Sequence, residues 1–209
     1  LTDTASSKGK AISRALGLSG PELQSIFTFL LAIHDLGKFS QSFQALALPE
    51  LEFLKKPDPG FSYDVPGGHA ALGMLLWKRS PVFRENTVEA CGWLEPNAPR
   101  RFARRSMETM LETTFGHHGQ PVNTGRDLAE NYFLPEDEQA ACNFAMEAAK
   151  LIKPEWPLSD MDNEFWHQTL KKATWQFAGL AVLADWLGSD QSVFSYVTEP
   201  MPLEDYWHD

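Results

Sequence analysis

Six residues of this sequence have side chains of the types that bind divalent cations, and each lies at an expected helix end or beside an apolar segment. Imidazole nitrogens together with carboxylate oxygens suit borderline cations such as Mn²⁺, Fe²⁺, Co²⁺, Ni²⁺ and Zn²⁺, whereas Ca²⁺ prefers oxygen ligands throughout. The sequence therefore predicts a cation site if these residues meet in space. They are His34, Asp35, His69, His117, His118 and Asp185.

Four histidines and two aspartates are more ligands than one cation needs and are enough for two. A carboxylate such as that of Asp35 can bridge two cations about 3.5–4 Å apart, the separation at which paired metals activate a water and stabilise the leaving oxygen of a phosphoryl group. We therefore expect phosphoester hydrolysis by in-line attack, without a covalent intermediate. Because metal-binding histidines usually donate their second ring N–H to an acceptor, we expect carboxylates or carbonyls beside His69 and His118.

Each of these residues also has an ordinary structural explanation. A histidine on a buried helix face is often a hydrogen-bonded core residue. Asp185 follows the apolar segment 177–184, and it either emerges into solvent or pairs with an arginine, because an unpaired buried charge costs several kcal/mol. However, several residues of metal-ligand type lie at helix ends or beside apolar segments, and this number favours the cation site over separate structural explanations. His167, in the polar first turns of the last long helix, and His208, in the tail, lack such a setting and are expected on the surface.

The elements that position these residues are predicted to be helices, because apolar residues recur with helical spacing and alternating strand patterns are absent. Ser19-Gly20-Pro21-Glu22 has the spacing of a capping box with proline in the first turn. The apolar stripe that follows is continued by His34, and Gly37 is expected to end the helix. Further helices are expected to begin at His69, to cover 100–115, to follow Pro135, and to run from about Asn163 to Leu187.

Two other segments complete the expected organisation. Residues 48–66 are rich in proline and are predicted to form a long surface connection. Residues 177–184 are apolar on nearly all sides of a helix, so this stretch is expected to be central to the fold. We therefore expect an all-α single domain over residues 1–209 with long connecting loops.

The composition narrows the class of protein. The chain has 209 residues, a net charge of −10 and 43% apolar residues, which predicts one folded core. Its two cysteines, Cys91 and Cys142, form no Cys-x-x-Cys pair, which argues against a disulfide framework and a thiolate zinc site and favours a reducing cytoplasm. No apolar run approaches the roughly 20 residues of a membrane span. The acidic balance argues against a dedicated duplex-binding module, but not against an enzyme whose positive charge comes from bound metal.

Four short motifs together resemble the HD metal-dependent phosphohydrolase superfamily, a helical fold named after its His-Asp pair. Their local context is more specific and is similar to the HD nuclease domain of the CRISPR-associated helicase-nuclease of type I interference systems. The resemblance extends from the first helix to Ser189. The motifs are His34-Asp35-Leu36-Gly37-Lys38-Phe39, Gly68-His69-Ala70, Gly116-His117-His118-Gly119 and Ala184-Asp185-Trp186-Leu187-Gly188-Ser189.

The resemblance implies an HD-superfamily helical bundle with endonuclease activity in antiviral defence. Such a domain cuts the displaced single DNA strand after an RNA-guided surveillance complex opens the target, and an ATP-driven helicase, fused or separate, supplies the strand. Its cofactors would be two divalent ions, from among Mn, Co, Ni, Fe and Mg. We expect no membrane partner.

The resemblance also implies roles for particular residues. The first cation would be held by an upstream histidine with His34, Asp35 and Asp185. The second would be held by Asp35 as the bridge, with His69, His117 and His118. No histidine precedes His34 in this sequence, so we expect either that the counterpart lies ahead of Leu1 or that the first site lacks one ligand. Lys38 matches a family lysine near the scissile phosphate, and its alternative explanation is a solvated lysine.

The sequence indicates residues that contact DNA less specifically than it indicates the cation ligands. Arg100, Arg101, Arg104 and Arg105 can line one helix side and follow a phosphate backbone, or they form a solvated face that balances nearby acids. The aromatic residues beside the motifs, Phe39, Phe43 and Trp186, can stack on bases, although such residues are more often core.

Two other functions remain open from the sequence. One is an HD phosphohydrolase acting on small nucleotides, which a closed pocket would favour. The other is a non-catalytic docking module in which metals only stabilise the fold.

Overall fold

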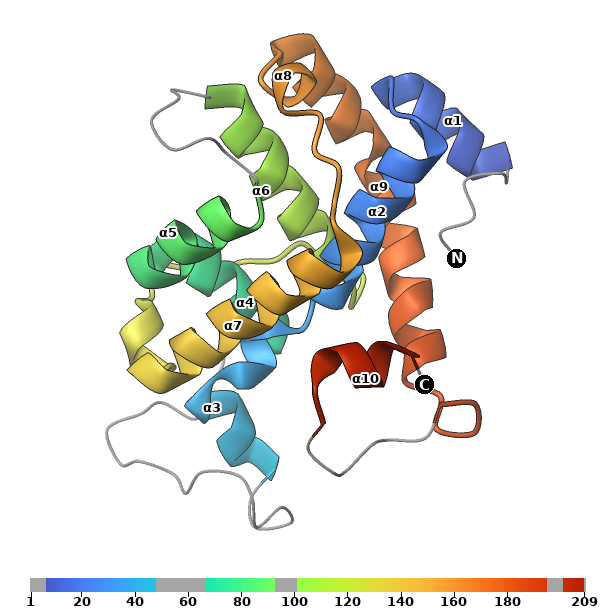
Figure 1. Cartoon of the computed structure of the whole chain (residues 1–209). Coiled ribbons are helices and arrows are strands. Elements are labelled where there is room, and N and C mark those ends of the chain that lie inside the picture. Colours follow the sequence, from blue (N-terminus) through green and yellow to red (C-terminus); the bar gives the residue numbers. More distant parts are fainter. Residues whose placement is uncertain (1–6, 48–66, 93–100, 195–200, 209) are drawn as a thin grey trace.

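The chain folds into helices joined by loops and turns, and no strand occurs in the part that the structure describes. A computed structural model describes residues 7–47, 67–92, 101–194 and 201–208 (Figure 1). The expected all-α class is confirmed. The elements are α1 (Ser7–Leu16), α2 (Gly20–Ala32), η1 (Leu36–Phe39), α3 (Gln41–Gln44), η2 (Ala45–Ala47), α4 (Gly68–Arg79), α5 (Pro81–Ala90), α6 (Arg101–Phe115), η3 (Ala129–Asn131), α7 (Pro135–Ile152), α8 (Leu158–Met161), α9 (Glu164–Gly188) and α10 (Leu203–His208).

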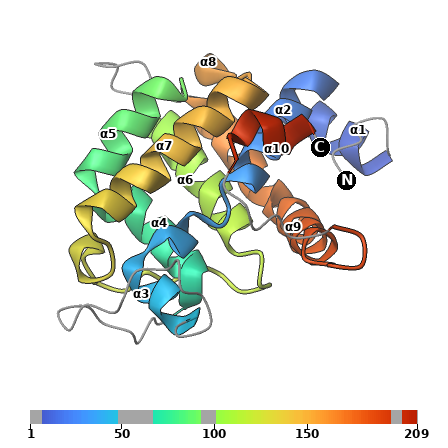
Figure 2. The same ribbon diagram turned by 60° about the horizontal axis from the view of Figure 1, so that its bottom comes forward.

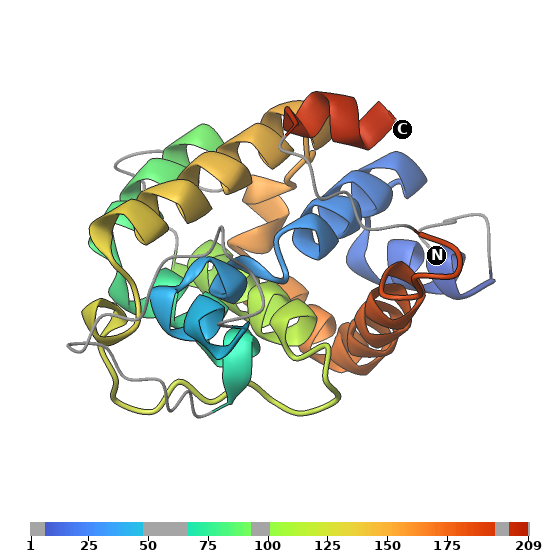
Figure 3. The same cartoon turned by 90° about the horizontal axis from the view of Figure 1, so that it is seen from below.

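Helix α6 is the centre of the arrangement, with α4 packed on one side and α9 on the other (Figures 1 and 3). Helix α7 covers α2 and α5, and Figure 2 shows α7 and α5 running side by side. No single helix among the described segments is long and apolar enough to cross a membrane. Ser7–Leu16 and Gly20–Phe39 pass that test only as a pair, bent by 98°.

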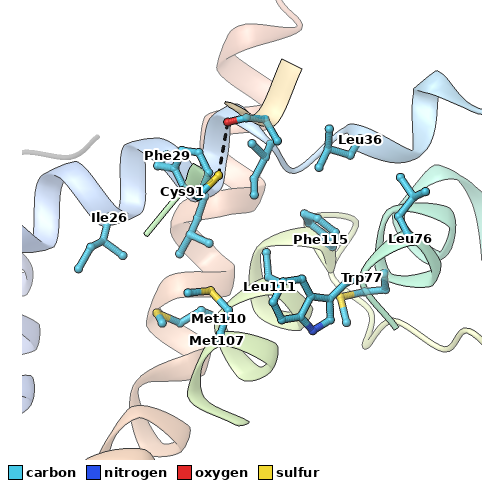
Figure 4. Close-up of a cluster of buried hydrophobic side chains, with 14 of the residues drawn as sticks. Ile26, Phe29, Leu36, Leu76, Trp77, Cys91, Met107, Met110, Leu111 and Phe115 are labelled. Atoms are coloured by element: carbon cyan, nitrogen blue, oxygen red, sulfur yellow. Dashed lines mark hydrogen bonds between the residues drawn. The ribbon is translucent and has the colours of Figure 1, made fainter. Parts of the chain in front are cut away.

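One buried apolar cluster extends from Ile12 in α1 to Phe177 in α9 and joins most of the elements (Figure 4). Its largest fully buried side chains include Phe29 of α2, Trp77 of α4 and Phe115 of α6. Truncating an aromatic side chain in such a core to alanine typically costs about 3–5 kcal/mol. These three helices are thus fixed to one another by packing. Phe29 and Phe115 lie in the last turns of α2 and α6, next to the histidines that follow, whereas Trp77 lies at the opposite end of α4 from His69.

Helix α2 begins as predicted but ends earlier. Ser19 and Glu22 form the capping box, with Ser19 N–H donating to Glu22 Oε2 at 2.7 Å. The helix ends at Ala32 rather than near Gly37, which lies inside η1. The reason is that the Leu31 carbonyl, which residue 35 would need to continue the helix, accepts hydrogen bonds from His34 N–H and His34 Nδ1.

The other predicted helices are present at α4, α6, α7 and α9. Asp137 in the first turn of α7 is buried and accepts main-chain N–H bonds from Leu134 and Gln41, both at 2.9 Å. This acid therefore caps its own helix and also ties α3 to α7. The predicted connection 48–66 and Arg100 lie outside the described residues.

Helix α9 differs from the prediction in its burial. Its apolar stretch was expected to be central, but only Phe177 and Ala181 within 177–184 are buried. Helices α1, α6 and α8 pack on α9, and the opposite side is uncovered by described residues. On that side Trp175 is 85% exposed and Leu183 is exposed too. The all-round apolar pattern therefore marks an edge helix with an apolar outer face.

Both cysteines are buried and free, which confirms that they form no disulfide. Cys91 Sγ–H donates to the Ala145 carbonyl at 3.7 Å, the dashed line in Figure 4. Burial raises the pKa of Cys91 to about 12 and that of Cys142 to about 11. Neither thiol is therefore ionised at neutral pH, and neither serves as a thiolate ligand.

The surface position predicted for His167 is wrong. Its side chain is only 8% exposed, and its Nδ1 lies 3.2 Å from Ser106 Oγ. Ser106 Oγ–H in turn donates to the Met161 carbonyl at 3.1 Å, so the imidazole Nδ1–H donates to the hydroxyl. The polar sequence around His167 concealed this role because only one side of the first turns of α9 faces the core. The exposure of the His208 side chain lies outside what the structure describes.

His167 predicts a pH effect on stability. Burial lowers the pKa of His167, and the positive charges of Lys171 and Arg105 lower it further. The unfolded chain therefore takes up this proton more readily, and native stability should fall as the pH drops below about 6.5. The H167Q variant keeps a donor for Ser106 but has no titrating imidazole. We expect its unfolding free energy to lack the part of the pH dependence that comes from His167. Urea unfolding from pH 7.5 to 5 checks it, and identical pH slopes for the two proteins would contradict it.

Candidate metal centre

The six predicted ligands come from four segments that are far apart in the sequence but meet in space. His34 and Asp35 lie in the turn after α2, and His69 lies in the first turn of α4. The other pair, His117 and His118, follows the end of α6, and Asp185 lies in the last turn of α9. The core described above packs these four helices together, so the ligands are positioned by rigid elements.

The ring nitrogens of His69, His117 and His118 form the first group, and an oxygen of Asp35 lies beside it. His69 Nε2 lies 3.1 Å from His117 Nε2 and 3.2 Å from His118 Nε2. Asp35 Oδ1 lies 3.0 Å from His69 Nε2. Two ligands 2.1 Å from one ion and at right angles to each other are about 3.0 Å apart. The separations therefore fit ligands gathered around one cation, which accepts the lone pairs that otherwise repel each other.

His34, His117 and Asp185 form the second group, with ligand atoms within 4.8 Å of one another. His34 Nε2 lies 3.5 Å from Asp185 Oδ1, and the His34 and His117 rings meet edge to face at 4.6 Å. His117 thus belongs to both groups, whereas the resemblance assigned it to one cation. Among the described residues Asp185 lies against His34 rather than an arginine, and its side chain is only 19% exposed.

The Asp35 carboxylate lies between the two groups. Its Oδ1 faces His69 and, at 3.8 Å, His117 Nε2, while its Oδ2 lies 3.4 Å from His34 Nε2. Within the described part of the chain, the buried atoms Asp35 Oδ1 and His34 Nε2 have no partner with hydrogen-bond geometry. Buried polar atoms are normally satisfied, so these two orphaned atoms fit a cation ligand set.

Main-chain hydrogen bonding fixes the orientation of one ligand. His34 Nδ1–H donates to the Leu31 carbonyl at 2.5 Å, which leaves Nε2 as the bare ligand nitrogen. The acceptors predicted beside His69 and His118 are not found among the described residues. The Phe43 ring instead packs edge-on against His69, with centroids 5.1 Å apart, and restricts that ring by contact.

The charges at the centre suit cation binding. Burial raises the pKa of Asp35, but the neighbouring rings of His69 and His34 and the Lys38 ammonium together lower it well below its ordinary value, so Asp35 is ionised. Burial and the neighbouring histidines lower the pKa of His117 to about 4, so this imidazole is neutral and able to ligate. The C-terminal ends of α2 and α6 lie next to these ligands, and their partial negative charge favours cations.

Close packing at Gly37 brings the turn that carries His34 and Asp35 onto α4. A Cβ atom at residue 37 would lie 1.9 Å from the His69 carbonyl oxygen and 2.8 Å from the Gly73 nitrogen. Gly73 is close-packed as well, since its Cβ would lie 2.9 Å from the Phe115 ring. Glycine is therefore present at residue 37 because of close backbone approach and not to end a helix.

Lys38 reaches the centre, whereas the arginines do not. Lys38 Nζ lies 2.6 Å from Asp35 Oδ2, and its side chain is 47% exposed. Residues 101, 104 and 105 lie at the start of α6, about 15–21 Å along the helix from its end near the histidines. There the Arg101 and Arg105 guanidinium groups lie over the Phe102 ring.

The three aromatic residues beside the motifs have different settings. Phe39 is half-buried against Phe144, with ring centroids 5.5 Å apart. Phe43 contacts His69 as described above. Trp186, next to Asp185, is 70% exposed. Only Trp186 has a ring face free of described residues over most of its area.

A protein-family model described as "Cas3, HD domain" matches residues 1–194 of the 209. The chain belongs to the Cas3 HD domain family. A search of the curated proteins gave no match, and neither did a search of the solved structures. Membership confirms the family that the four motifs indicated. It makes the chain an HD-type metal-dependent hydrolase, and the two groups above are residues of this Cas3 HD domain that can hold divalent metal.

Sequence reasoning singled out the six residues that meet at this centre, but it missed the residues that support them. The carbonyl of Leu31, the ring of Phe43 and the close approach at Gly37 give no local signal of their roles. Phe43 was noted only as a base-stacking candidate. A glycine two residues after a ligand pair, with no need to end a helix, was the one available sign of close packing.

Proposed function

We propose that this chain is a single HD nuclease domain over residues 1–209. It uses two divalent transition-metal ions to hydrolyse phosphodiester bonds of single-stranded DNA in CRISPR interference. The observation that supports this most directly is the Asp35 carboxylate between two groups of ligands, each oxygen facing a different group. Cations bound there would activate water and neutralise charge on the phosphate.

The residues of the centre then have distinct tasks. His34, His117 and Asp185 would hold one cation, and His69, His117 and His118 would hold the other. Asp35, with one oxygen towards each group, would contribute to both, and the cations would supply charge stabilisation and an activated water for in-line displacement. The fixed ring of His34 and the packed ring of His69 limit reorganisation during the reaction.

Lys38 is proposed to bind the scissile phosphate. Its ion pair with Asp35 places a positive charge beside the bridge. Cations bound to Asp35 would weaken that pair, and the exposed ammonium is then free to turn towards a non-bridging phosphate oxygen. A lysine acts as a mobile point charge in such sites.

A polymer fits the accessible side of the centre better than a small nucleotide. His118 is exposed, and the Lys38 side chain is 47% exposed. The described residues therefore leave the Asp35 carboxylate accessible on the side of His118 and Lys38. An open site admits a continuous strand in endonucleolytic cleavage, whereas nucleotide hydrolases favour enclosure.

The wider setting follows from the family. We propose that an ATP-driven helicase domain or subunit supplies the strand and that an RNA-guided surveillance complex exposes it. The reaction would take place in the cytoplasm as part of antiviral defence. The acidic charge of the chain supports reliance on bound cations and partners for DNA affinity.

Circular single-stranded DNA tests the proposal directly. Metal-free protein is incubated with the circle and, in parallel, with a nucleotide panel, each with Mn²⁺, Co²⁺, Ni²⁺ or Mg²⁺. We expect linear products that appear only with metal and are abolished in D185N. D190N is the matched control, because Asp190 lies just past α9 and hydrogen-bonds only within its own turn. Phosphate release from nucleotides with intact circles would instead identify a small-nucleotide hydrolase.

The arginines are proposed as an outlying DNA contact. Replacing Arg101, Arg104 and Arg105 together by glutamine should weaken DNA binding and reduce the salt slope of log K by about 0.7 for each lost phosphate contact. Because they lie far from the bridge, turnover at saturating DNA should stay unchanged. Fluorescence anisotropy across a salt series checks this, and an unchanged slope would assign these residues to a solvated face.

A further inference from the structure

A groove of about 480 Å³ lies beside the metal centre, between α6, α9 and the loop that follows His118. Its wall includes Gly116 and Gly119, which flank the ligands His117 and His118 in the sequence. On the α9 side it reaches Val182, less than one turn from Asp185. The groove therefore runs up to the centre from one side.

The α9 wall has one large aromatic side chain and a gap next to it. Lys171, Trp175 and Gly179 follow one another at four-residue spacing and share a helix face. Trp175 is 85% exposed. A Cβ atom at residue 179 would meet nothing within 4 Å, so this glycine leaves the space beside Trp175 open.

The charge of the groove suits an anionic strand with apolar bases. Lys171 lies on its wall, and the acid on the opposite wall, Glu112, is paired with Lys78 at 2.8 Å. The remaining lining is mostly apolar, including Pro121 and Val122. From Trp175 to Val182 the wall is about 10 Å long, since a helix rises 1.5 Å per residue.

We propose that this groove binds the single-stranded DNA next to the scissile phosphate, with one base stacked on Trp175 and a phosphate near Lys171. The proposal rests on the proposed nuclease function and adds a binding subsite to it. Stacking on an indole tolerates any base because every base has a π-face. The subsite would thus hold a displaced strand regardless of sequence and direct its backbone towards His118.

Binding measured without metal tests the groove independently of cleavage. Labelled oligothymidylate is titrated with the full chain in EDTA and followed by anisotropy. We expect W175A to bind at least about fivefold more weakly and W175F to recover most of the loss, since stacking is worth ~1–3 kcal/mol per base. F165A is the matched control, because Phe165 is 80% exposed on the same helix but does not line the groove.

Filling the gap gives a second, independent test. G179M should block the groove while leaving Trp175 in place, and it should raise the melting temperature because glycine is a poor helix former. Weaker DNA binding by a more stable protein cannot be attributed to unfolding. Q176M is the control, since Gln176 is exposed on α9 outside the groove. Loss of binding in G179M but not in Q176M supports the subsite.

The possible results separate this subsite from the nuclease proposal. Crosslinking of 5-iodouracil DNA to Trp175, together with weaker W175A binding, supports the groove even if no circle is cut. Cleavage by the wild type with unchanged DNA affinity in both W175A and G179M would overturn the groove while leaving the nuclease intact. In that case a protein segment would be the better candidate for its occupant.

Discussion

Replacing Asp35 by asparagine is expected to lower cleavage of single-stranded DNA by three orders of magnitude or more. One oxygen of this carboxylate faces His69 and His117 and the other faces His34. An asparagine has the same shape but only one acceptor oxygen and no charge, so it cannot bridge two cations. Losing several kcal/mol of charge stabilisation corresponds to roughly 10³-fold in rate. Turnover on a fluorescent oligonucleotide with saturating Mn²⁺ measures the loss.

The same variant distinguishes catalysis from a purely structural use of metal. The metal-free D35N protein should lose only on the order of 1 kcal/mol of unfolding free energy, because the carboxylate and its partner Lys38 are partly exposed. Thermal melting in EDTA provides the measurement. If D35N melts far below the wild type only when metal is present, and the wild type cuts no DNA, the cations would act as a structural support for a docking module.

Replacing Gly37 by alanine is expected to separate the two halves of the centre. The added methyl group would lie 1.9 Å from the His69 carbonyl oxygen, so the turn that carries His34 and Asp35 must move away from α4. We expect a loss of about 3 kcal/mol of unfolding free energy, at the upper end for overpacked sites. Co²⁺ affinity should fall roughly 10–100-fold, as when ligand orientation is disturbed.

Urea unfolding and a Co²⁺ titration followed by visible absorption measure these two effects. G188A is the control, because a Cβ at residue 188 meets nothing within 4 Å and should leave both quantities near the wild-type values. A G37A protein with wild-type Co²⁺ affinity would show that the turn can shift without moving the ligands, which contradicts the packing argument.

The residues that meet at the candidate metal centre could be proposed from the sequence because the signals are local. A histidine or aspartate beside an apolar stripe is unusual unless it has a polar partner or a ligand. The two adjacent pairs at positions 34–35 and 117–118 indicated a cation as that ligand. The helices were predictable for the same kind of reason, since Ser19 and Glu22 cap α2 through side chains three residues apart.

Most of the failures have a common physical cause, which is contact between distant segments. The burial of His167 depends on Ser106, sixty-one residues earlier. The early end of α2 is the exception, since it is set locally by the hydrogen bond from the His34 ring to the Leu31 carbonyl. The outer face of α9 is exposed because α1 and α6 cover only one side. No pattern within a single helix contains this information. His117 belongs to both ligand groups, and a groove lies beside Trp175, because segments far apart in the sequence meet there.

The hydrogen bond between His34 and Leu31 makes the first ligand unusually robust to mutation. The acceptor is a main-chain carbonyl, so it survives any substitution of the Leu31 side chain that preserves the helix. A carboxylate in the same position would be lost by a single codon change. The tautomer of this histidine is thus set by the backbone itself and does not depend on which side chains surround it.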